Sequence, residues 1–271
     1  MEIPFIKYSG SGNDFIIIDN RNESFHLSRE QIAFFCKRRE GIGADGVVYL
    51  NKSKKGNDFS FRIWNADGSE AEMCGNASRS IVHYAYYYLK LKADKHFVFD
   101  TMNGVYEGEV IDEESSSEIK IKMTELYDLD AIDISDLATD SSLYLNTGVP
   151  HAVLQVSDVS RINISNVGRA IRNDKRFSNE GTNVDFFQVL DESAQRIRLR
   201  VYERGVEAET LCCGTGIMAT AITCAKRLGW SGRIIVDAEG GQLSAIVDKE
   251  LKELYFQGPV KAIYKGVIIC E

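Results

Sequence analysis

Hydrophobic and polar residues alternate in short runs along most of the chain. This is the pattern of β-strands that bury one face, and Gly, Asn, Asp and Ser gather in the turns between the runs. In the first half the predicted strands cover residues 3–8, 14–19, 47–50, 59–64, 96–100, 104–110 and 118–123. The first half is therefore predicted to consist mostly of short strands.

Two helices are predicted among these strands. Ser28 can act as the N-cap of a helix over residues 29–39, with Glu30 in its first turn. A second helix follows Cys74. Its apolar face is predicted to consist of Ile81, Val82, Ala85, Tyr86 and Leu89.

The second half repeats this order of elements. Its helix over residues 217–225 has few polar residues on any face, which predicts burial, and Gly229 can end it. Residues 254–258 resemble the scar of a protease tag. They lie where the repeat requires a strand, equivalent to residues 119–123, so we interpret them as native.

The repeat also shows in a phrase that occurs twice, Glu-Ala-Glu followed by Cys-Gly, at residues 70–75 and 207–214. Further matches in the same order join residues 12–18 to 148–154, 40–45 to 180–185, 61–65 to 199–203, 97–100 to 234–237, and Gly104 to Gly241. Glu40 precedes Cys74 by 34 residues, and Glu180 precedes Cys213 by 33. A period of about 136–140 residues has the length of a domain. The chain is therefore predicted to contain two related domains.

Composition narrows the class of protein. The 271 residues are 44% hydrophobic and 27% charged, as in soluble globular proteins. A net charge of −8 argues against nucleic acid as the main partner. No apolar stretch approaches the ~20 residues that span a bilayer, and the N-terminus lacks the pattern of a signal peptide. We therefore expect a cytoplasmic protein with no membrane partner and with reduced cysteines.

The six cysteines and four histidines do not predict a metal site. The sequence contains no Cys-x-x-Cys pair, and the histidines are scattered. Cys36, Cys224 and Cys270 lie in apolar stretches, where a cysteine is usually a small buried hydrophobe. Cys74 and Cys213 differ from them because each precedes a glycine at the start of a predicted helix.

Two thiols in matched positions are suited to inverting a carbon centre. Removing a proton from an amino-acid α-carbon requires an electron sink such as pyridoxal phosphate, or two one-proton groups around an anion-stabilising site. A helix N-terminus lowers the pKa of a cysteine, and its N–H groups bind carboxylates. No feature specifically indicates a pyridoxal site, so we expect no cofactor.

Cys212 competes with Cys213 for the second role. Nine residues separate Asn65 from Cys74, and nine separate Glu203 from Cys212. The Cys-Gly alignment instead selects Cys213 and places one inserted residue near Ala208. We favour Cys213, because contact with the glycine-rich helix start is what the chemistry needs.

Motifs spread over nearly the whole chain resemble those of the diaminopimelate epimerase family. They are Gly10-Ser11-Gly12-Asn13-Asp14-Phe15, Gly41-Ile42-Gly43-Ala44-Asp45-Gly46, Asn65-Ala66-Asp67-Gly68-Ser69-Glu70, Cys74-Gly75-Asn76, Gly181-Thr182-Asn183-Val184, Tyr202-Glu203-Arg204-Gly205 and Cys213-Gly214-Thr215-Gly216. The resemblance implies a cofactor-independent epimerase that interconverts LL- and meso-diaminopimelate, on the route to lysine and peptidoglycan. A small molecule would be its partner, and a homodimer is an open option.

The resemblance also implies an α+β fold with two pseudo-symmetric domains. Each would be a mostly antiparallel sheet or barrel around a central helix, with the site in the cleft. The expected domains are residues 1–120 with the C-terminal strand 264–271, which carry Cys74, and residues 121–263, which carry Cys213.

Residue roles follow from the resemblance. Cys74 and Cys213 would transfer the protons. The substrate-binding residues would be Gly75, Asn76, Gly214 and Thr215 at the reacting carboxylate, Asn13 and Glu203 near the reacting amino group, and Asn65, Asn183 and Arg204 at the distant end. Arg204 suits a carboxylate, and Asn amides can bind either group. His151 belongs to the family's Pro-His pair, with a structural and a site-lining role both open.

The chain departs from the family pattern in places, and two other functions stay open. Val149 replaces a common Asn, residues 77–80 read Ala-Ser-Arg-Ser, and Cys212 is extra. A proline or hydroxyproline racemase would need a site for only one carboxylate and a ring amine. A redox-sensing or binding protein would use Cys74 and Cys213 as a regulatory disulfide.

Overall fold

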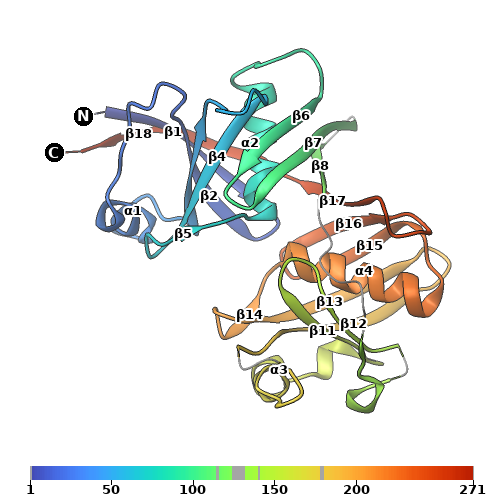
Figure 1. The fold of residues 1–271 in the computed structure, drawn as a ribbon. Coiled ribbons are helices and arrows are strands. Elements are labelled where there is room, and N and C mark those ends of the chain that lie inside the picture. Colours follow the sequence, from blue (N-terminus) through green and yellow to red (C-terminus); the bar gives the residue numbers. More distant parts are fainter. Residues whose placement is uncertain (1, 114–115, 124–131, 140, 178–179, 271) are drawn as a thin grey trace. The chain divides into compact units, whose positions relative to one another are not determined.

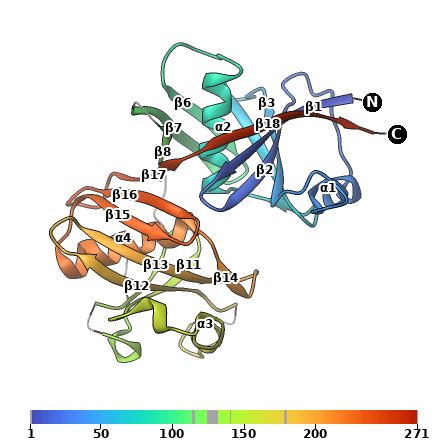
Figure 2. The same cartoon turned by 180° about the vertical axis from the view of Figure 1, so that it is seen from behind.

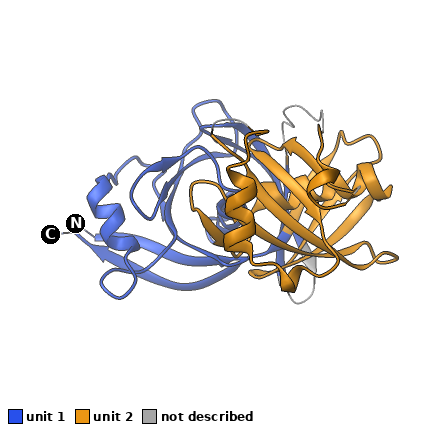
Figure 3. Ribbon diagram, turned by 90° about the horizontal axis from the view of Figure 1, so that it is seen from below, with its two compact units in different colours: residues 1–122, 258–271 blue, residues 123–257 orange. Residues whose placement is uncertain are grey.

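The computed structural model describes residues 2–113, 116–123, 132–139, 141–177 and 180–270. The chain divides into two compact units, Met1–Lys122 with Gly258–Glu271, and Met123–Gln257 (Figure 3). In both units strands predominate, as expected of the predicted α+β class. Among the described residues, no helix has the length and apolar character needed to cross a membrane.

The elements of the first unit follow the predicted order (Figure 1). They are β1 (Glu2–Gly10), β2 (Asn13–Asp19), α1 (Arg29–Cys36), β3 (Gly46–Asn51), β4 (Phe59–Asn65), β5 (Glu70–Ala71), α2 (Gly75–Tyr87), β6 (His96–Thr101), β7 (Gly104–Glu113), β8 (Ser116–Lys122) and β18 (Lys261–Ile269).

The second unit repeats this order with a short strand and two 3-10 turns added. Its elements are β9 (Ile132–Asp133), η1 (Ser135–Leu137), β10 (Leu143–Asn146), β11 (Pro150–Gln155), η2 (Val159–Arg161), α3 (Ile164–Arg172), β12 (Asn183–Asp191), β13 (Arg196–Glu203), β14 (Ala208–Thr210), α4 (Gly214–Leu228), β15 (Gly232–Ala238), β16 (Gly241–Val247) and β17 (Leu254–Pro259). Residues 254–258, which look like a tag scar, therefore form part of a strand.

Strand pairing has the same pattern in both units. In the first, β1–β2 is antiparallel, β2–β3 parallel, β3–β4 antiparallel, β4–β6 parallel, and β6–β7–β8 antiparallel. In the second, β10–β11, β11–β12, β12–β13, β13–β15 and β15–β16–β17 follow the same alternation. The repeat found in the sequence is thus a repeat of topology, and the predicted fold class is confirmed.

The strand register corrects one marker of that repeat. Phe15 lies opposite Gly46, and His151 lies opposite Asn183. Because Phe15 and His151 are equivalent, Asn183 corresponds to Gly46 and not to Gly43. The match of residues 40–45 with 180–185 is therefore wrong by three residues, because the loops that lead to β3 and β12 differ in length.

Both helices that follow the cysteines are deeply buried. The prediction for α4 is confirmed, with residues 216–224 all buried, and its C-cap Gly229 has φ 69°. Ile81, Val82 and Ala85 of the predicted apolar face of α2 are buried, and the burial extends around the helix, because residues 76–85 are all buried. Polar residues fit there because the Ser78 and Ser80 hydroxyls donate to carbonyl oxygens one turn back, at 3.0 Å each.

Two predicted boundaries shift. Ser28 caps α1 as expected, with Gln31 completing a capping box, but the helix ends at Cys36 because Lys37 is extended. Residues 258–263 group with the first unit, whereas the sequence places them in the second domain. The reason is β18, which pairs with β1 from Lys261 onward (Figure 2).

Gly168 tests the packing of α3 against β13. A Cβ at Gly168 would lie 2.6 Å from Cβ of the fully buried Tyr202. We expect Gly168→Ala to lower the free energy of unfolding by about 1–3 kcal/mol from overpacking, although Ala in a helix normally gains ~0.5–1 kcal/mol over Gly. Urea denaturation measures the change. The control is Ser165→Ala at an exposed position of the same helix, and equal stability of the two variants would contradict this packing.

Candidate active site

Cys74 and Cys213 occupy the same position in the two units, the N-cap of a buried helix. Cys74 precedes α2 with φ −144° and ψ 122°, and Cys213 precedes α4 with φ −124° and ψ 113°. Ser, Thr, Asp or Asn usually holds this position and accepts a hydrogen bond from a first-turn N–H. Here a thiol stands at the positive end of each helix dipole instead.

The register identifies Cys213, and not Cys212, as the counterpart of Cys74. Trp64 lies opposite Glu70 in the β4–β5 hairpin, and the equivalent Tyr202 lies opposite Glu209. Each glutamate precedes its N-cap cysteine by four residues. The inserted residue therefore lies in the turn before Glu209. The proton-transfer roles of the two thiols stay a prediction.

In the first unit the predicted site residues Asn13 and Asn76 are in direct contact. Asn76 is buried in the first turn of α2, and its Nδ2 donates to Asn13 Oδ1 at 2.6 Å. Asn13, at the start of β2, donates in turn from Nδ2 to Asp45 Oδ2 at 3.0 Å. This contact places both amides near Cys74 and Gly75, which adjoin Asn76 in the chain.

Asn65 is not part of this contact. It ends β4, is exposed, and its Nδ2 donates to Ser69 Oγ at 3.1 Å within the following turn. Asn65 pairs with Gly46 of β3, and β3 lies between β4, which carries Asn65, and β2, which carries Asn13. Its predicted role at a distant substrate end stays a prediction.

In the second unit a chain of polar groups leads away from Cys213. Its Sγ lies 3.3 Å from Thr215 Oγ1, and Thr215 Oγ1 lies 3.0 Å from His151 Nε2. His151 Nδ1 lies 2.5 Å from Asp185 Oδ2, and both side chains are fully buried. The carboxylate accepts from Nδ1–H, so Nε2 is free to accept from the Thr215 hydroxyl. Thr215 thus links the His151 ring to Cys213, and the structural and site-lining roles of His151 both stay predictions.

Asn183 connects two further predicted residues of the second unit. Its Oδ1 accepts from the backbone N–H of Arg204 at 2.8 Å, and its Nδ2 donates to Pro150 O at 3.1 Å. The Arg204 guanidinium lies 3.4 Å from the exposed Glu180. These contacts hold the β13–β14 turn against the start of β12, where Asn183 also approaches His151.

Burial raises the pKa of the Cys213 thiol well above its usual value, and the nearby carboxylates of Glu203 and Asp185 raise it further. Hydrogen bonds from Thr215 and from the backbone of Gly216 act in the opposite direction. Burial also raises the pKa of Glu203, although a hydrogen bond with Thr210 lowers it. At rest this half of the site therefore favours a protonated thiol.

Two buried charged residues of these networks were missed in the sequence. Asp185 interrupts the apolar run Val184–Phe187, and Arg79 interrupts the small residues that follow Cys74. Both could have been identified from the sequence, because each is a charged residue within a segment that is otherwise apolar or small. Asp185 also explains the glycine at 216, because a Cβ there would lie 2.3 Å from Asp185 Oδ1.

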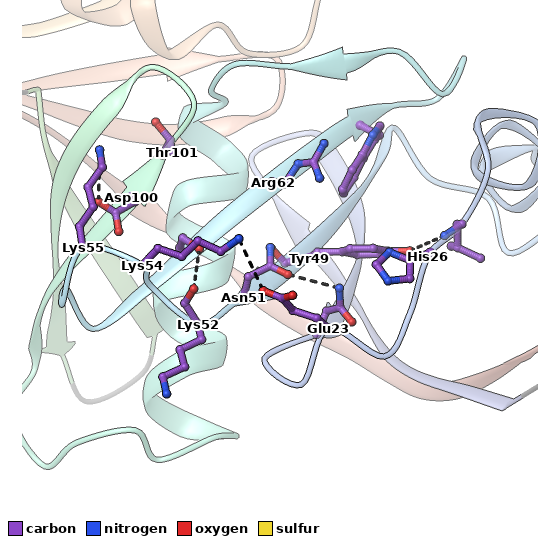
Figure 4. A pocket seen from close by; sticks show the side chains of 14 residues that line it. Glu23, His26, Tyr49, Asn51, Lys52, Lys54, Lys55, Arg62, Asp100 and Thr101 are labelled. Carbon is purple, nitrogen blue, oxygen red and sulfur yellow. Dashed lines mark hydrogen bonds and ion pairs between the residues drawn. The ribbon is translucent and has the colours of Figure 1, made fainter.

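A pocket of about 580 Å³ in the first unit lies at the ends of β2 and β3 and along β4 from Ser60 to Trp64 (Figure 4). The predicted site residue Asn13 lies at the opposite end of β2, whereas Asn65 directly follows Trp64 of the pocket lining. Several cations of this pocket face acids, with Lys54 3.8 Å from Glu23 and Lys55 4.0 Å from Asp100. Among the described residues, no group of three His, Cys, Asp or Glu side chains could hold a metal ion.

A protein-family model described as diaminopimelate epimerase matches residues 5–127 and 143–263. A diaminopimelate epimerase of Chlorobaculum tepidum is 37% identical over 96% of this chain and 99% of its own. One from a Hydrogenobaculum species is 39% identical over 98% of both chains.

Solved structures share the fold at low identity. A Bacillus anthracis phenazine biosynthesis protein of the PhzF family has a TM-score of 0.75 at 14% identity and covers 100% of both chains. A hydroxyproline epimerase from Agrobacterium vitis has a TM-score of 0.67 at 13% identity, over 98% of this chain and 92% of its own.

The surroundings of Cys213 predict slow alkylation. Burial and the carboxylates of Glu203 and Asp185 keep the thiol protonated near neutral pH. Glu203→Gln removes one negative charge, which lowers the pKa of Cys213 and raises the thiolate fraction, by about tenfold for each pKa unit. Iodoacetamide labelling at pH 8, read by mass spectrometry at Cys213, measures the rate. Glu239→Gln, an exposed change in the same unit, is the control, and equal rates in the two variants would exclude this role of Glu203.

Proposed function

The chain belongs to the diaminopimelate epimerase family and is an isomerase, and we propose that it interconverts LL- and meso-diaminopimelate without a cofactor. The observation that carries the proposal is the equivalence of Cys74 and Cys213. Both are N-cap residues of buried helices in units of the same topology. An inversion by two bases needs two acid–base groups, one for each face of the carbon, and two matched thiols supply such a pair.

In the proposed reaction one thiolate takes the α-proton and the other thiol donates its proton to the opposite face of the carbon. One C–H bond breaks and another forms. One cysteine gains an S–H bond while the other loses its S–H bond, so no redox partner is needed. Charge that develops on the α-carboxylate is stabilised by N–H groups at the starts of α2 and α4. Gly75, Asn76, Gly214 and Thr215 supply these first turns.

Cys213 is the cysteine that donates its proton when substrate first binds to the resting enzyme. Its burial and its carboxylate neighbours favour the thiol form before substrate binds. Once it becomes a thiolate, the Thr215 hydroxyl, 3.3 Å from the sulfur, can turn from His151 Nε2 and donate to it. Cys74, partly exposed at the start of α2, is then the base that takes the substrate proton.

The other contacts divide between the two ends of the substrate. Asn13 and Glu203 bind the reacting amino group. Asn65, Asn183 and Arg204 bind the distant amino-acid end, where a guanidinium can hold a carboxylate through two hydrogen bonds. A site with two such ends favours diaminopimelate over proline, which has one carboxylate and a ring amine.

The same function places the protein in the cytoplasm, in the synthesis of lysine and of peptidoglycan precursors. Reduced cysteines are expected in that compartment. A homodimer is supported by β18. Val267 and Ile269 lie on one face of this strand, 51% and 72% exposed, and a second copy of the chain would cover them.

Proton exchange tests the two-base mechanism. Incubation with LL-diaminopimelate in deuterated water should give meso product with deuterium at the inverted carbon. Cys74→Ser and Cys213→Ser should each reduce turnover by about 100-fold or more, because general acid–base groups typically contribute 10²–10⁴-fold. Mass spectrometry of the product measures the label. The matched control is Cys36→Ser, a buried thiol outside the site. Wild-type turnover in both site variants, or exchange on proline alone, would refute the proposal.

A charge on β18 tests the dimer. We expect the wild-type chain to sediment as a dimer and the double variant Val267→Lys with Ile269→Lys to sediment as a monomer, because both lysines would have to be buried between copies. Analytical ultracentrifugation over a range of concentrations measures the mass. Lys249→Glu, an exposed charge change in the second unit, should leave the mass unchanged. A monomeric wild-type chain at every concentration would contradict the dimer.

A further inference from the structure

We propose that Arg79 and Asp45 are positioning residues, which lock the side-chain amides of Asn76 and Asn13 in the one orientation that substrate binding can use. This inference rests on the proposed function and assigns a task to two charged residues outside the predicted site. It concerns the first unit alone.

The four residues form a continuous chain of hydrogen bonds. Arg79 Nη2 donates to Asn76 Oδ1 at 2.5 Å. Asn76 Nδ2 donates to Asn13 Oδ1 at 2.6 Å, and Asn13 Nδ2 donates to Asp45 Oδ2 at 3.0 Å. The bonded residues are distant in sequence at two of the three steps, so the chain crosses from α2 to the start of β2 and to the loop before β3.

The chemistry of the two ends fixes the direction of the chain. A guanidinium only donates hydrogen bonds, so the amide of Asn76 must turn its oxygen toward Arg79 and its nitrogen toward Asn13. A carboxylate only accepts, so Asn13 must turn its nitrogen toward Asp45 and its oxygen toward Asn76. An amide between two neutral hydroxyls could flip, whereas these two amides have a single arrangement.

This arrangement leaves specific groups for a ligand. Asn76 keeps one Nδ2–H, a donor that suits the reacting carboxylate. Asn13 keeps one lone pair on Oδ1, an acceptor that suits an ammonium group. If both amides were flipped, the positions of donors and acceptors would be exchanged, and each would present the wrong polarity to an amino acid.

Both ends of the chain are held by further bonds. Arg79 is fully buried, and its guanidinium also donates to Ser11 Oγ at 3.1 Å and to Pro259 O at 3.0 Å. Asp45 also accepts from the backbone N–H of Asp14 at 3.1 Å and from Arg38 at 3.0 Å. Burying a guanidinium against neutral oxygens is costly. An apolar side chain would fill the same space at less cost if packing were the only requirement.

The second unit shows that the scaffold does not need this chain. The register makes Asn13 equivalent to Val149 and Asp45 equivalent to Thr182. Counted from the N-cap cysteines, Asn76 is equivalent to Thr215, and Arg79 to Met218. All four members are replaced together in a unit of the same topology, so the set serves the site rather than the fold.

Arg79→Met tests the proposal by giving α2 the residue that α4 carries at the equivalent position. We expect kcat/KM for α-proton exchange on diaminopimelate to fall by about 10- to 100-fold, mainly through KM, since small misplacements of binding groups cost up to 10²-fold. Arg79→Lys, which keeps a donor, should recover part of the loss. Asp45→Asn changes the other, partly exposed end of the hydrogen-bond chain and should also raise KM.

A second measurement separates positioning from a loss of fold or of function. The side-chain amide NMR signals of Asn13 and Asn76, assigned from their absence in Asn13→Asp and Asn76→Asp, should exchange slowly with solvent in the wild type. They should shift and exchange faster in both Arg79→Met and Asp45→Asn. Arg62→Met breaks an exposed ion pair with Glu70 in the same unit and is the matched control, expected to leave both amide signals and KM unchanged.

The outcomes are distinct. Unchanged amide signals in Arg79→Met and Asp45→Asn, or kinetics equal to those of Arg62→Met, would overturn the positioning role. If the wild-type protein fails to exchange diaminopimelate, the proposed function fails. The amide signals then still decide whether Arg79 and Asp45 orient the two asparagines.

Discussion

A helix that is buried on every side keeps unpaired N–H groups in its first turn, and the rest of each unit depends on how these are satisfied. Water usually pairs with such groups, but α2 is buried over residues 76–85 and α4 over residues 216–224. Both units begin the helix with Cys-Gly, where a capping hydroxyl or carboxylate would otherwise stand. In the proposed function N–H groups of these first turns bind the anionic end of the substrate, and a thiol stands beside them.

The two units satisfy this constraint with different polar groups. Two residues after each cysteine stands a side chain held by a buried partner, Asn76 by Arg79 and Thr215 by His151. The first partner is a permanent cation, and the second is an imidazole ring in contact with Asp185. Duplication therefore preserved the backbone while the charges diverged, so the two thiols stand in different electrostatic surroundings.

Local patterns in the sequence predicted most of the helices and strands. Alternating runs predicted the strands, and Ser28 and Gly229 predicted helix ends, because neighbours in the chain decide these features. Arg79 and Asp45 were missed because their partners lie far along the chain, as with Ser11, 68 residues from Arg79. Asn183 was matched to Gly43 because loop length hides the register, which only strand pairing reveals.

Unequal surroundings have a cost in a reaction that exchanges the roles of two thiols. In the proposed reaction each turnover leaves the protons exchanged between the two thiols, and the enzyme must return to its starting form before it binds the next substrate of the same hand. A larger difference in pKa between the thiols makes the form that follows proton transfer from Cys213 less stable, because the thiol with the higher pKa has then lost its proton. The carboxylates of Glu203 and Asp185 raise the pKa of Cys213, while Thr215 and the Gly216 N–H lower it. Because Gly216 allows Asp185 to approach and its own N–H to reach the sulfur, one residue contributes to both sides of this balance. A side chain at this position would disturb the balance as well as the packing.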